Sequence, residues 1–547
     1  MLNNTKVQIV DISWHNIYLS LTLSSNAQDS YEYEITDLKG NTYPLDMKEH
    51  KIVINIVNFP QIHVLHSGKW YITYKNEESV NLVGLTSKCG YKLEHLDKVY
   101  RYGAQKYAYI ITFSIQEEGK LLETETTEDS MVLCMQTSYM MINKREDGRN
   151  LLVESSSLKQ WIRKVMFVFA KSMIQCAYLL LSNFRKKDGK HILLMSETRV
   201  PIGGNLKALD DRLKERHLDE VFTISYSFSK TLQQSKWKTL FTWSRLLWLI
   251  TKQDYIFVDD YVPIFKTITL RKETKLIQLW HAGVGFKSVG YARFGKAGSP
   301  HVVDSCHRKY DYAVVGAEGL IPVYEEVFGI TKEHFLPYGL PRLDGYLDEH
   351  KIQDYKDKFY KEHPELKNKE IIMFAPTYRG STQKEAYYPF EKLDLKALYE
   401  VLGENRVFIF KMHPFIVEKV EIPKEYQDRI YDFSQGYDIN ELFYVIDILV
   451  TDFSSNIYEF ALQHKPMIFY AYDKDFYQLT RGVHRTLDQA PGVVCETFDE
   501  LLNTLKNQEY SIDKLESFIQ ESFNNKTKLA SDCIIDDILL KQKEMTS

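Results

Sequence analysis

Residues 446–472 read IDILVTDFSSNIYEFALQHKPMIFYAY and decide the fold of the region around them. A hydrophobic run leads into a polar turn with Ser454 and Ser455, a helical stretch follows, and Pro466 separates it from a second hydrophobic run. This order predicts a strand, a helix and a second strand of a parallel sheet. The turn would place two hydroxyls and several unpaired N–H groups at a helix N-terminus, where the helix dipole favours an anion. The stretch therefore predicts a phosphate site at the carboxyl end of a strand.

The same alternation of apolar strands and helical stretches extends over residues 190–500. Continuous apolar runs are typical of parallel strands that are covered on both faces. They fall into two groups, at about 190–340 and 368–500, each the size of one Rossmann-like unit. We expect an α/β fold in which two such units face each other across a cleft. The predicted strands read HILLMSE, EVFTISYS, YIFVDD, TKLIQLWH, YDYAVVGAE, EIIMFAPTY, RVFIFKMHP, IDILVTDF and KPMIFYAY.

The N-terminal part of the chain has a different pattern. Short alternating runs such as KVQIVDISW and KIVINIVNF are separated by Asn, Gly and Asp, which predicts a small antiparallel β domain. This domain shows no catalytic constellation, and a role in substrate or partner contact and a purely structural role both remain open. We therefore divide the chain into domains at residues 1–150, 151–345 and 346–547.

Composition restricts the classes of function. The formal net charge is −5, from 69 basic and 74 acidic residues, so nothing in the overall charge favours nucleic acid as a partner. The six cysteines form no C-x-x-C pairs, which fits a reducing compartment and opposes a structural zinc site. The N-terminus, MLNNTKVQIVDISWHN, lacks a basic region followed by an apolar one, so we expect no cleaved secretory signal and a cytoplasmic protein.

Two windows, 155–187 and 221–253, contain no Asp or Glu, although 74 of the 547 residues are acidic. Basic amphipathic helices with Trp and Phe suit the surface of an anionic bilayer. The alternative is that their apolar stripes pack on the sheets and their cations are merely solvated. Residues 165–181 are also long enough for a membrane span to be considered, but the central Lys171 disfavours insertion by about 3 kcal/mol. The candidate membrane-binding residues are Arg163, Lys164, Trp237, Lys238, Arg245 and Trp248.

Two histidines stand at equivalent places in the two groups of strands. His281 ends LIQLWH and His413 ends VFIFKMH, each just past a hydrophobic strand. A histidine there has a pKa suited to proton transfer at neutral pH. One such histidine alone would more often be structural, but facing units would bring both rings to one cleft. We therefore predict that His281 and His413 are catalytic.

Other polar residues near the strand ends are candidates for binding phosphate or ribose. Thr377 and Arg379 lie in APTYRG, Arg481 follows the strand that ends at Tyr472, and all three can bind phosphate oxygens. Glu459 lies five residues past Ser454 and is a candidate for ribose hydroxyls. The alternatives are a turn with a surface arginine and a solvated helix glutamate. The chain lacks a dinucleotide fingerprint, a P-loop, a nucleophile elbow and a cluster of metal ligands, so we predict no cofactor and no metal.

Taken in order, six segments resemble the CDP-glycerol glycerophosphotransferase family, which includes the teichoic acid primases and polymerases of Gram-positive bacteria. They are QLWHAGVGFKSVG, YGLPRLD, FAPTYRG, FKMHP, TDFSSNIYEFALQHKPMIFYAYD and a later RG, and they lie between about residues 190 and 500. The resemblance implies a GT-B-like pair of Rossmann domains, a CDP-glycerol or CDP-ribitol donor, a lipid-linked acceptor and peripheral attachment to the cytoplasmic face of the membrane. It also implies that His281 and His413 are the catalytic pair and that Gly339, Pro341 and Arg342 belong to the nucleotide site.

The chain departs from the common family pattern at two places. It has WHAGVGFKSVG where many members have WHGTPLKKIG, and PRLD where many have PRND. Both changes lie near the pockets that the resemblance implies, so they bear on the identity of the polyol more than on the reaction. Two other functions remain open: a GT-B glycosyltransferase or nucleotide-sugar epimerase, and a scaffold without enzymatic activity that binds membrane and polymer.

Overall fold

The computed structural model describes residues 6–59, 62–77, 79–103, 106–118, 131–144, 150–153, 158–184, 187–229, 236–280, 289–296, 299–301, 305–380, 385–481, 486–523 and 528–541. Contacts divide the chain into two compact units. The first comprises Met1–Ala170, Val289–Ser305 and Glu326–Ile330, and the second comprises Lys171–Ser288, Cys306–Glu325 and Thr331–Ser547.

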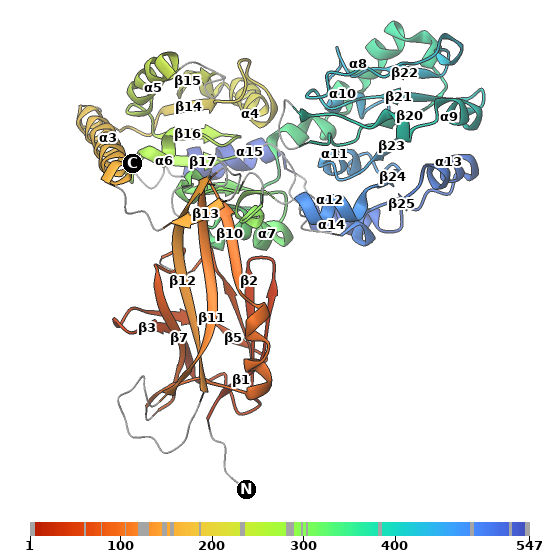
Figure 1. The fold of residues 1–547 in the computed structure, drawn as a ribbon. Coiled ribbons are helices and arrows are strands. Elements are labelled where there is room, and N and C mark those ends of the chain that lie inside the picture. The colour runs from red at the N-terminus through yellow and green to blue at the C-terminus, as the bar shows by residue number, and fades with distance from the viewer. Residues whose placement is uncertain are drawn as a thin grey trace. The chain divides into compact units, whose positions relative to one another are not determined.

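The first unit is built on a mostly antiparallel sheet, in which 13 strands are seen among its described residues (Figure 1). Alternate side chains enter one core, as Leu19, Leu21 and Leu23 do in β2. The segment Val289–Ser305 belongs to this unit because Tyr291 and Phe294 join the same core. The strands are β1 (Gln8–His15), β2 (Tyr18–Leu23), β3 (Glu32–Asp37), β4 (Thr42–Leu45), β5 (Met47–Lys48), β6 (Lys51–Asn55), β7 (Gly68–Lys75), β8 (Val80–Leu82), β9 (Gly84–Leu85), β10 (Lys98–Tyr102), β11 (Tyr107–Glu117), β12 (Met131–Lys144) and β13 (Asn150–Val153).

The second unit contains two parallel sheets, each with six strands among the described residues and with helices on both faces (Figure 1). The first sheet has the order β15-β14-β16-β17-β18-β19, and every neighbouring pair is parallel. Its strands are β14 (His191–Ser196), β15 (Thr223–Phe228), β16 (Tyr255–Val258), β17 (Lys275–Gln278), β18 (Tyr312–Val314) and β19 (Phe335–Leu336). The helices of this part are α4 (Gly204–Glu215), α5 (Lys236–Ile250), α6 (Ile264–Thr267), α7 (Ile321–Phe328) and α15 (Ala530–Ile534), which continues as η14 (Ile535–Leu540).

The second sheet has the order β22-β21-β20-β23-β24-β25 and is also parallel throughout. Its strands are β20 (Glu370–Phe374), β21 (Arg406–Phe410), β22 (Ile430–Asp432), β23 (Ile448–Thr451), β24 (Met467–Tyr470) and β25 (Val493–Cys495). The helices around it are α8 (Glu349–Glu362), α9 (Leu395–Leu402), α10 (Ile439–Leu442), α11 (Asn456–Ala461), α12 (Lys474–Arg481), α13 (Phe498–Asn507) and α14 (Leu515–Ser522).

The apolar runs of the second sheet fill two cores, one on each face. In β20, Ile371 and Met373 enter one buried cluster, whereas Ile372 and Phe374 enter the other. Successive side chains of a strand point to opposite faces, so a strand covered on both faces must be apolar throughout.

All nine strands predicted from the sequence are confirmed. The short edge strands β19, β22 and β25 were not predicted, because two or three residues give no periodic signal.

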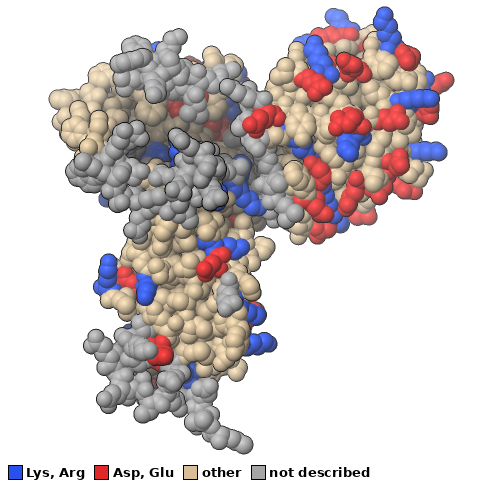
Figure 2. Space-filling view, viewed as in Figure 1, with Lys and Arg blue, Asp and Glu red and all other residues tan. Residues whose placement is uncertain are grey.

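Helix α3 (Leu158–Asn183) has an apolar exposed face. Its inner side is anchored by Tyr178, which is fully buried, and by the side chain of Gln175, which exchanges hydrogen bonds with the backbone of Thr269. Met166 and Phe169 are 66% and 64% exposed, and the described surface at the upper left of Figure 2 carries few charges. Of the helices in the described part of the chain, none combines the length and apolarity that crossing a membrane requires.

Candidate active site

The strand order of the second sheet reverses between β20 and β23, so the segments that follow these two strands meet at its carboxyl edge. The N–H of Thr377, after β20, donates to Asp452 Oδ1 at 2.8 Å. Its Oγ1 donates to both carboxylate oxygens of Asp452, at 3.0 and 2.9 Å. Asp452 lies directly before the turn with Ser454 and Ser455. Thr377 therefore fixes the base of the predicted phosphate turn.

Arg379 lies behind the same turn, with only 7% of its surface exposed. Its Nη1 donates to Asp452 Oδ2 at 2.9 Å, and its Nε and Nη2 donate to the two oxygens of Asp473 at 2.6 and 2.7 Å. Burial acts to lower the pKa of Arg379, but Asp452 and Asp473 raise it further, so the guanidinium stays charged. In this arrangement Thr377 and Arg379 hold carboxylates. Their predicted contact with phosphate stays a prediction.

One hydroxyl of the turn, that of Ser454, is already hydrogen-bonded to the backbone of the turn. Ser454 is 7% exposed, and its Oγ accepts the N–H of Asn456 at 3.2 Å. Ser455 is the N-cap residue of α11 and has helical φ and ψ, so its hydroxyl makes no capping hydrogen bond. Asn456 and Ile457 begin the helix, where backbone N–H groups lack partners within the helix. The N–H of Asn456 already has a partner in Ser454 Oγ, so the predicted binding of phosphate by the rest of the turn stays a prediction.

Glu459 is a buried glutamate, 2% exposed, and not the solvated one that was the alternative. Its Oε1 is paired with Nη2 of Arg342, from the segment η8 (Pro341–Leu347). Oε2 of Glu459 and Nε of Arg342 are both buried and have no hydrogen-bond partner among the described residues. A buried pair with one acceptor and one donor unused is suited to a group that both donates and accepts, as a hydroxyl does.

His413 lies just past β21 at the same carboxyl edge, as predicted. Its Nδ1 accepts the N–H of Phe415 at 3.1 Å, so the neutral ring carries its proton on Nε2. The ring packs against Tyr378, with 4.8 Å between the ring centroids. This orientation makes Nε2 the donor of the ring. Its predicted partner, His281, lies outside the described residues.

The first sheet has its own reversal point, between β14 and β16, and buried carboxylates gather there. Asp260 Oδ2 accepts hydrogen bonds from Ser196 Oγ at 2.6 Å and Thr198 Oγ1 at 2.7 Å. Asp259 is fully buried and pairs with Arg199 Nη2 at 2.9 Å. Burial raises the pKa of Asp259 to about 7, against the opposing charge of Arg199.

The sequence-based prediction missed these carboxylates. Their signal is the pair of acids that ends YIFVDD, directly after a buried strand. Among the described residues, no group of three or more His, Cys, Asp or Glu side chains is placed to hold a metal ion.

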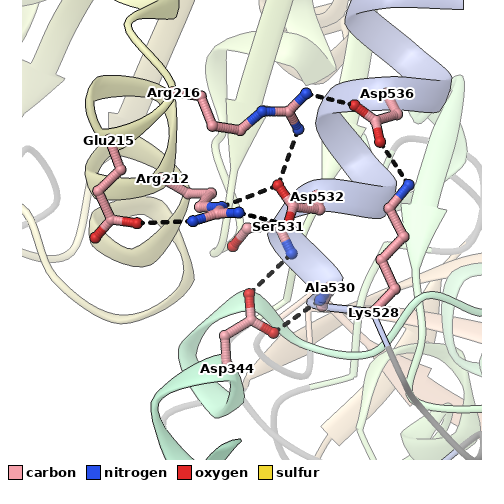
Figure 3. A network of polar contacts seen from close by, with 9 residues as sticks. All are labelled: Arg212, Glu215, Arg216, Asp344, Lys528, Ala530, Ser531, Asp532 and Asp536. Carbon is pink, nitrogen blue, oxygen red and sulfur yellow. Dashed lines mark hydrogen bonds and ion pairs between the residues drawn. The ribbon is translucent and has the colours of Figure 1, made fainter. Parts of the chain in front are cut away.

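The residues around Arg342 form a polar junction between α4, η8 and α15. The carboxylate of Asp344 accepts the N–H groups of Ala530 and Ser531 at 2.8 and 2.9 Å, which caps α15 (Figure 3). Asp532 of α15 is bound in turn by Arg212 of α4 and by Arg216, the residue that follows α4 (Figure 3). A pocket of about 570 Å³ lies at this junction.

Two predicted nucleotide residues, Pro341 and Arg342, line this pocket, whereas Ser454, Thr377 and His413 are not among its lining residues in the described part of the chain. Gly339 lies before the junction with a φ of +88°, and its N–H donates to Val315 O at 2.9 Å. A left-handed φ of this kind favours glycine.

Several predicted residues cannot be placed fully. Arg481 ends α12, but its side chain lies outside the described part, as do the side chains of Arg163, Lys164, Trp237 and Lys238 in α3 and α5. Arg245 and Trp248 of α5 are described and exposed, Trp248 by 45%.

Comparison with known proteins shows which family the chain resembles. The family model described as CDP-glycerol:poly(glycerophosphate) glycerophosphotransferase matches residues 177–540. The teichoic acid ribitol-phosphate polymerase TarK of Staphylococcus aureus is 35% identical, over 84% of this chain and 88% of its own length. The ribitol-phosphate polymerase TarL of the same species is 31% identical, over 84% of this chain and 80% of its own. The teichoic acid glycerol-phosphate primase of Bacillus subtilis is 30% identical, over 50% of this chain and 70% of its own.

A solved structure of the wall teichoic acid polymerase TagF has a TM-score of 0.53 and 20% identity, and covers 72% of this chain and all of that one. This likeness confirms a mixed α/β fold with several sheets. With two thirds of the chain inside the family model and a relative matched over most of its length, the chain belongs to the CDP-glycerol:poly(glycerophosphate) glycerophosphotransferase family.

Proposed function

We propose that this protein transfers a polyol phosphate from a CDP-polyol to the terminal hydroxyl of a lipid-linked teichoic acid precursor and releases CMP. Membership of the family supports the reaction. The buried pair of Glu459 and Arg342 is the observation that supports a nucleotide site. The unused acceptor is Oε2 of Glu459, in the helix that follows the turn with Ser454 and Ser455, and the unused donor is Nε of Arg342, in η8. We assign the ribose hydroxyls to this pair and the diphosphate to Ser454, Ser455 and the N–H groups of the turn.

Ribitol is the polyol that we favour. The relatives TarK and TarL, which match 84% of the chain, are ribitol-phosphate polymerases, whereas the glycerol-phosphate primase of Bacillus subtilis matches 50% of it. The donor is therefore CDP-ribitol in this proposal, with CDP-glycerol as the substrate to be tested beside it.

The chemical step is an in-line displacement at the phosphorus that bears the polyol. The acceptor oxygen forms a bond to this phosphorus, and the bond from the phosphorus to the oxygen shared with CMP breaks, so CMP leaves with that oxygen. His281 takes the proton of the acceptor hydroxyl, and His413 donates from Nε2 to a phosphoryl oxygen. The serine turn stabilises the charge that gathers on the phosphoryl oxygens, and Arg481 adds a cation. Thr377 and Arg379 contribute by holding Asp452, and with it the turn.

We assign the two parallel sheets to two Rossmann-type domains that face each other across a cleft, as in a GT-B-like fold. Residues 151–345 form the acceptor domain in this proposal, apart from the stretches 151–170, 289–305 and 326–330 that belong to the first unit, residues 346–547 form the CDP-polyol domain, and residues 1–150 form the β domain before them. The exposed apolar face of α3 and the exposed Arg245 and Trp248 support peripheral attachment to the cytoplasmic face of an anionic membrane.

The proposal is tested by CMP release. Purified protein is incubated with a lipid-linked teichoic acid acceptor and either CDP-ribitol or CDP-glycerol. The released CMP is measured, and the mass of the product is determined by mass spectrometry. We expect CMP and a product longer by one or more ribitol phosphates. Replacement of Glu459 by Gln should raise the KM for the donor.

Turnover of a UDP-sugar without CMP release from either CDP-polyol would instead indicate a glycosyltransferase or an epimerase. Binding to liposomes with no turnover at all would indicate a scaffold.

A further inference from the structure

Asn205, at the start of α4, joins two segments that are far apart in the sequence. It is fully buried. Its Nδ2 donates to the carbonyl oxygens of Leu279, at 3.2 Å, and of Trp280, while its Oδ1 accepts the backbone N–H of Arg342 at 3.1 Å. One amide side chain therefore binds two carbonyl oxygens just after β17 and a backbone N–H at the beginning of η8.

The contacts continue from Arg342 to the second sheet. Its guanidinium is paired with Glu459 in α11, four residues past Ser455. The backbone carbonyl of Trp280 is thus joined through Asn205 and Arg342 to the helix that follows the serine turn. Trp280 is the last residue before His281 in the chain and has a left-handed φ of +47°. A residue other than glycine adopts such a φ only where its surroundings hold it there.

The position of Arg342 is fixed from a second direction. Two residues on, Asp344 caps α15, and Asp532 of α15 is bound by Arg212 of α4 through Nε and Nη2, at 2.9 and 2.8 Å (Figure 3). Helix α4 thus holds η8 directly through Asn205 and indirectly through α15. The backbone of Arg342 lies between the guanidinium, which contacts Glu459, and the N–H that Asn205 accepts, so both contacts act on the same short segment.

We propose that Asn205 and Arg342 are positioning residues, which link nucleotide binding at Glu459 to the placement of the backbone at Leu279 and Trp280. This inference rests on the proposed function, because it takes the nucleotide to be a cytidine phosphate whose ribose binds Glu459. A ribose hydroxyl that donates to Glu459 Oε2 and accepts from Arg342 Nε gives both atoms a hydrogen-bond partner and holds the guanidinium in place. Asn205 then holds the carbonyl before His281 in the arrangement that the reaction needs.

The test uses the full chain and CMP as the probe. Hydrogen exchange of the amides of Leu279 and Trp280 is measured with and without saturating CMP. These amides donate to Val258 O at 2.7 Å and to Gln278 Oε1 at 2.8 Å, so their exchange reports on the end of β17. We expect CMP to slow this exchange in the wild type. In Asn205→Leu, CMP should bind with an affinity within about threefold of wild type but leave the exchange unchanged, and kcat should fall at least about tenfold with little change in KM for the donor.

Two further variants separate coupling from simple loosening. Asn205→Asp keeps an acceptor for the N–H of Arg342 but removes the donor to Leu279 and Trp280, so it should lose the protection by CMP as Asn205→Leu does. Thr274→Val is the matched control, because it removes a buried hydrogen bond to Gln253 O just before β17 and does not replace Asn205, Arg342 or Glu459, the residues of the proposed link. It should lower stability and keep the protection.

The outcomes are distinct from those that test the function. Protection by CMP that persists in both Asn205 variants, or a kcat equal to that of the wild type, overturns the positioning role while CMP release stands. Loss of protection in Thr274→Val as well overturns it too, because the effect is then general loosening of β17. A wild type that neither binds nor releases CMP overturns the proposed function together with this inference.

Discussion

Arg379 and Asp473 are joined side by side, with Nε donating to Oδ2 at 2.6 Å and Nη2 donating to Oδ1 at 2.7 Å. Asp452 takes a third hydrogen bond from the same guanidinium. Tyr472 and Tyr477 complete the surroundings, with their ring centroids 5.3 and 5.1 Å from the guanidinium carbon. The charge that sequence reasoning assigned to phosphate is thus balanced by two carboxylates that follow β23 and β24.

Replacement of Arg379 by Met should therefore destabilise the protein by about 3–5 kcal/mol, because it leaves the buried carboxylate of Asp452 and the partly buried one of Asp473 without a cation. Urea unfolding followed by circular dichroism measures the change. Arg429→Met is the matched control, since Arg429 pairs with an exposed carboxylate, that of Asp428, and its loss should cost no more than about 1 kcal/mol. Equal stability of Arg379→Met and wild type would mean that the carboxylates are neutral or that Arg379 does not bind them in solution.

His413 offers a test of which ring nitrogen acts. Its Nδ1 accepts the N–H of Phe415, which leaves Nε2 as the donor. Glutamine places an amide N–H₂ near the position of Nε2, whereas asparagine reaches only the position of Nδ1. We expect CMP release to fall at least about a hundredfold in His413→Ala and His413→Asn and to fall less in His413→Gln. An asparagine variant as active as the glutamine variant would assign the function of the ring to Nδ1.

The sequence predicted the second sheet and its turn well, because both depend on local patterns. Apolar runs predicted the strands, and the strand order then brought Thr377 to Asp452 at the reversal point between β20 and β23. The partner of Arg379 could not be predicted in this way. Asp473 and Arg379 are 94 residues apart, and only the packing of β20 beside β23 and β24 shows that they meet.

The first sheet shows the same limit. Asp259 and Asp260 follow a strand that was correctly predicted, yet their partners come from the end of β14 and the residues after it, and β14 pairs with β16 across a long crossover. Asn205 has no signal at all in the sequence, because its three partners are the two residues that follow β17, Leu279 and Trp280, and Arg342 of η8. Such contacts follow from topology, which local periodicity does not specify.

The exposed apolar face of α3 changes how membrane binding should respond to salt. Attachment by cations alone weakens as salt rises, whereas insertion of apolar side chains does not. We expect Phe169→Glu, which replaces a side chain that is 64% exposed, to lower binding to vesicles of anionic lipid at both low and high salt. Arg245→Glu should lower it mainly at low salt.

Co-sedimentation with vesicles at two salt concentrations measures the binding of both variants. Val53→Glu, at a half-exposed position in β6, is a control that should bind as wild type does. Unchanged binding of Phe169→Glu would remove α3 from the membrane surface.

Asp259 should make stability fall as the pH rises towards neutrality. Burial raises its pKa to about 7 in the folded protein, whereas an unfolded chain has a value of about 4 for this group. Between these values the folded state binds more protons than the unfolded one, so the free energy of unfolding decreases with rising pH across this window and levels off above it. Asp259→Asn removes the group that titrates and keeps its shape.

Thermal unfolding at pH 5 and pH 8 measures this contribution as the difference between the two proteins. We expect the midpoint of the wild type to fall further, relative to that of Asp259→Asn, when the pH is raised. Other buried carboxylates whose pKa is raised, such as Asp254, are present in both proteins and cancel in the comparison. An equal fall in both proteins would show that Asp259 is already ionised at pH 5, which would mean that Arg199 outweighs the effect of burial.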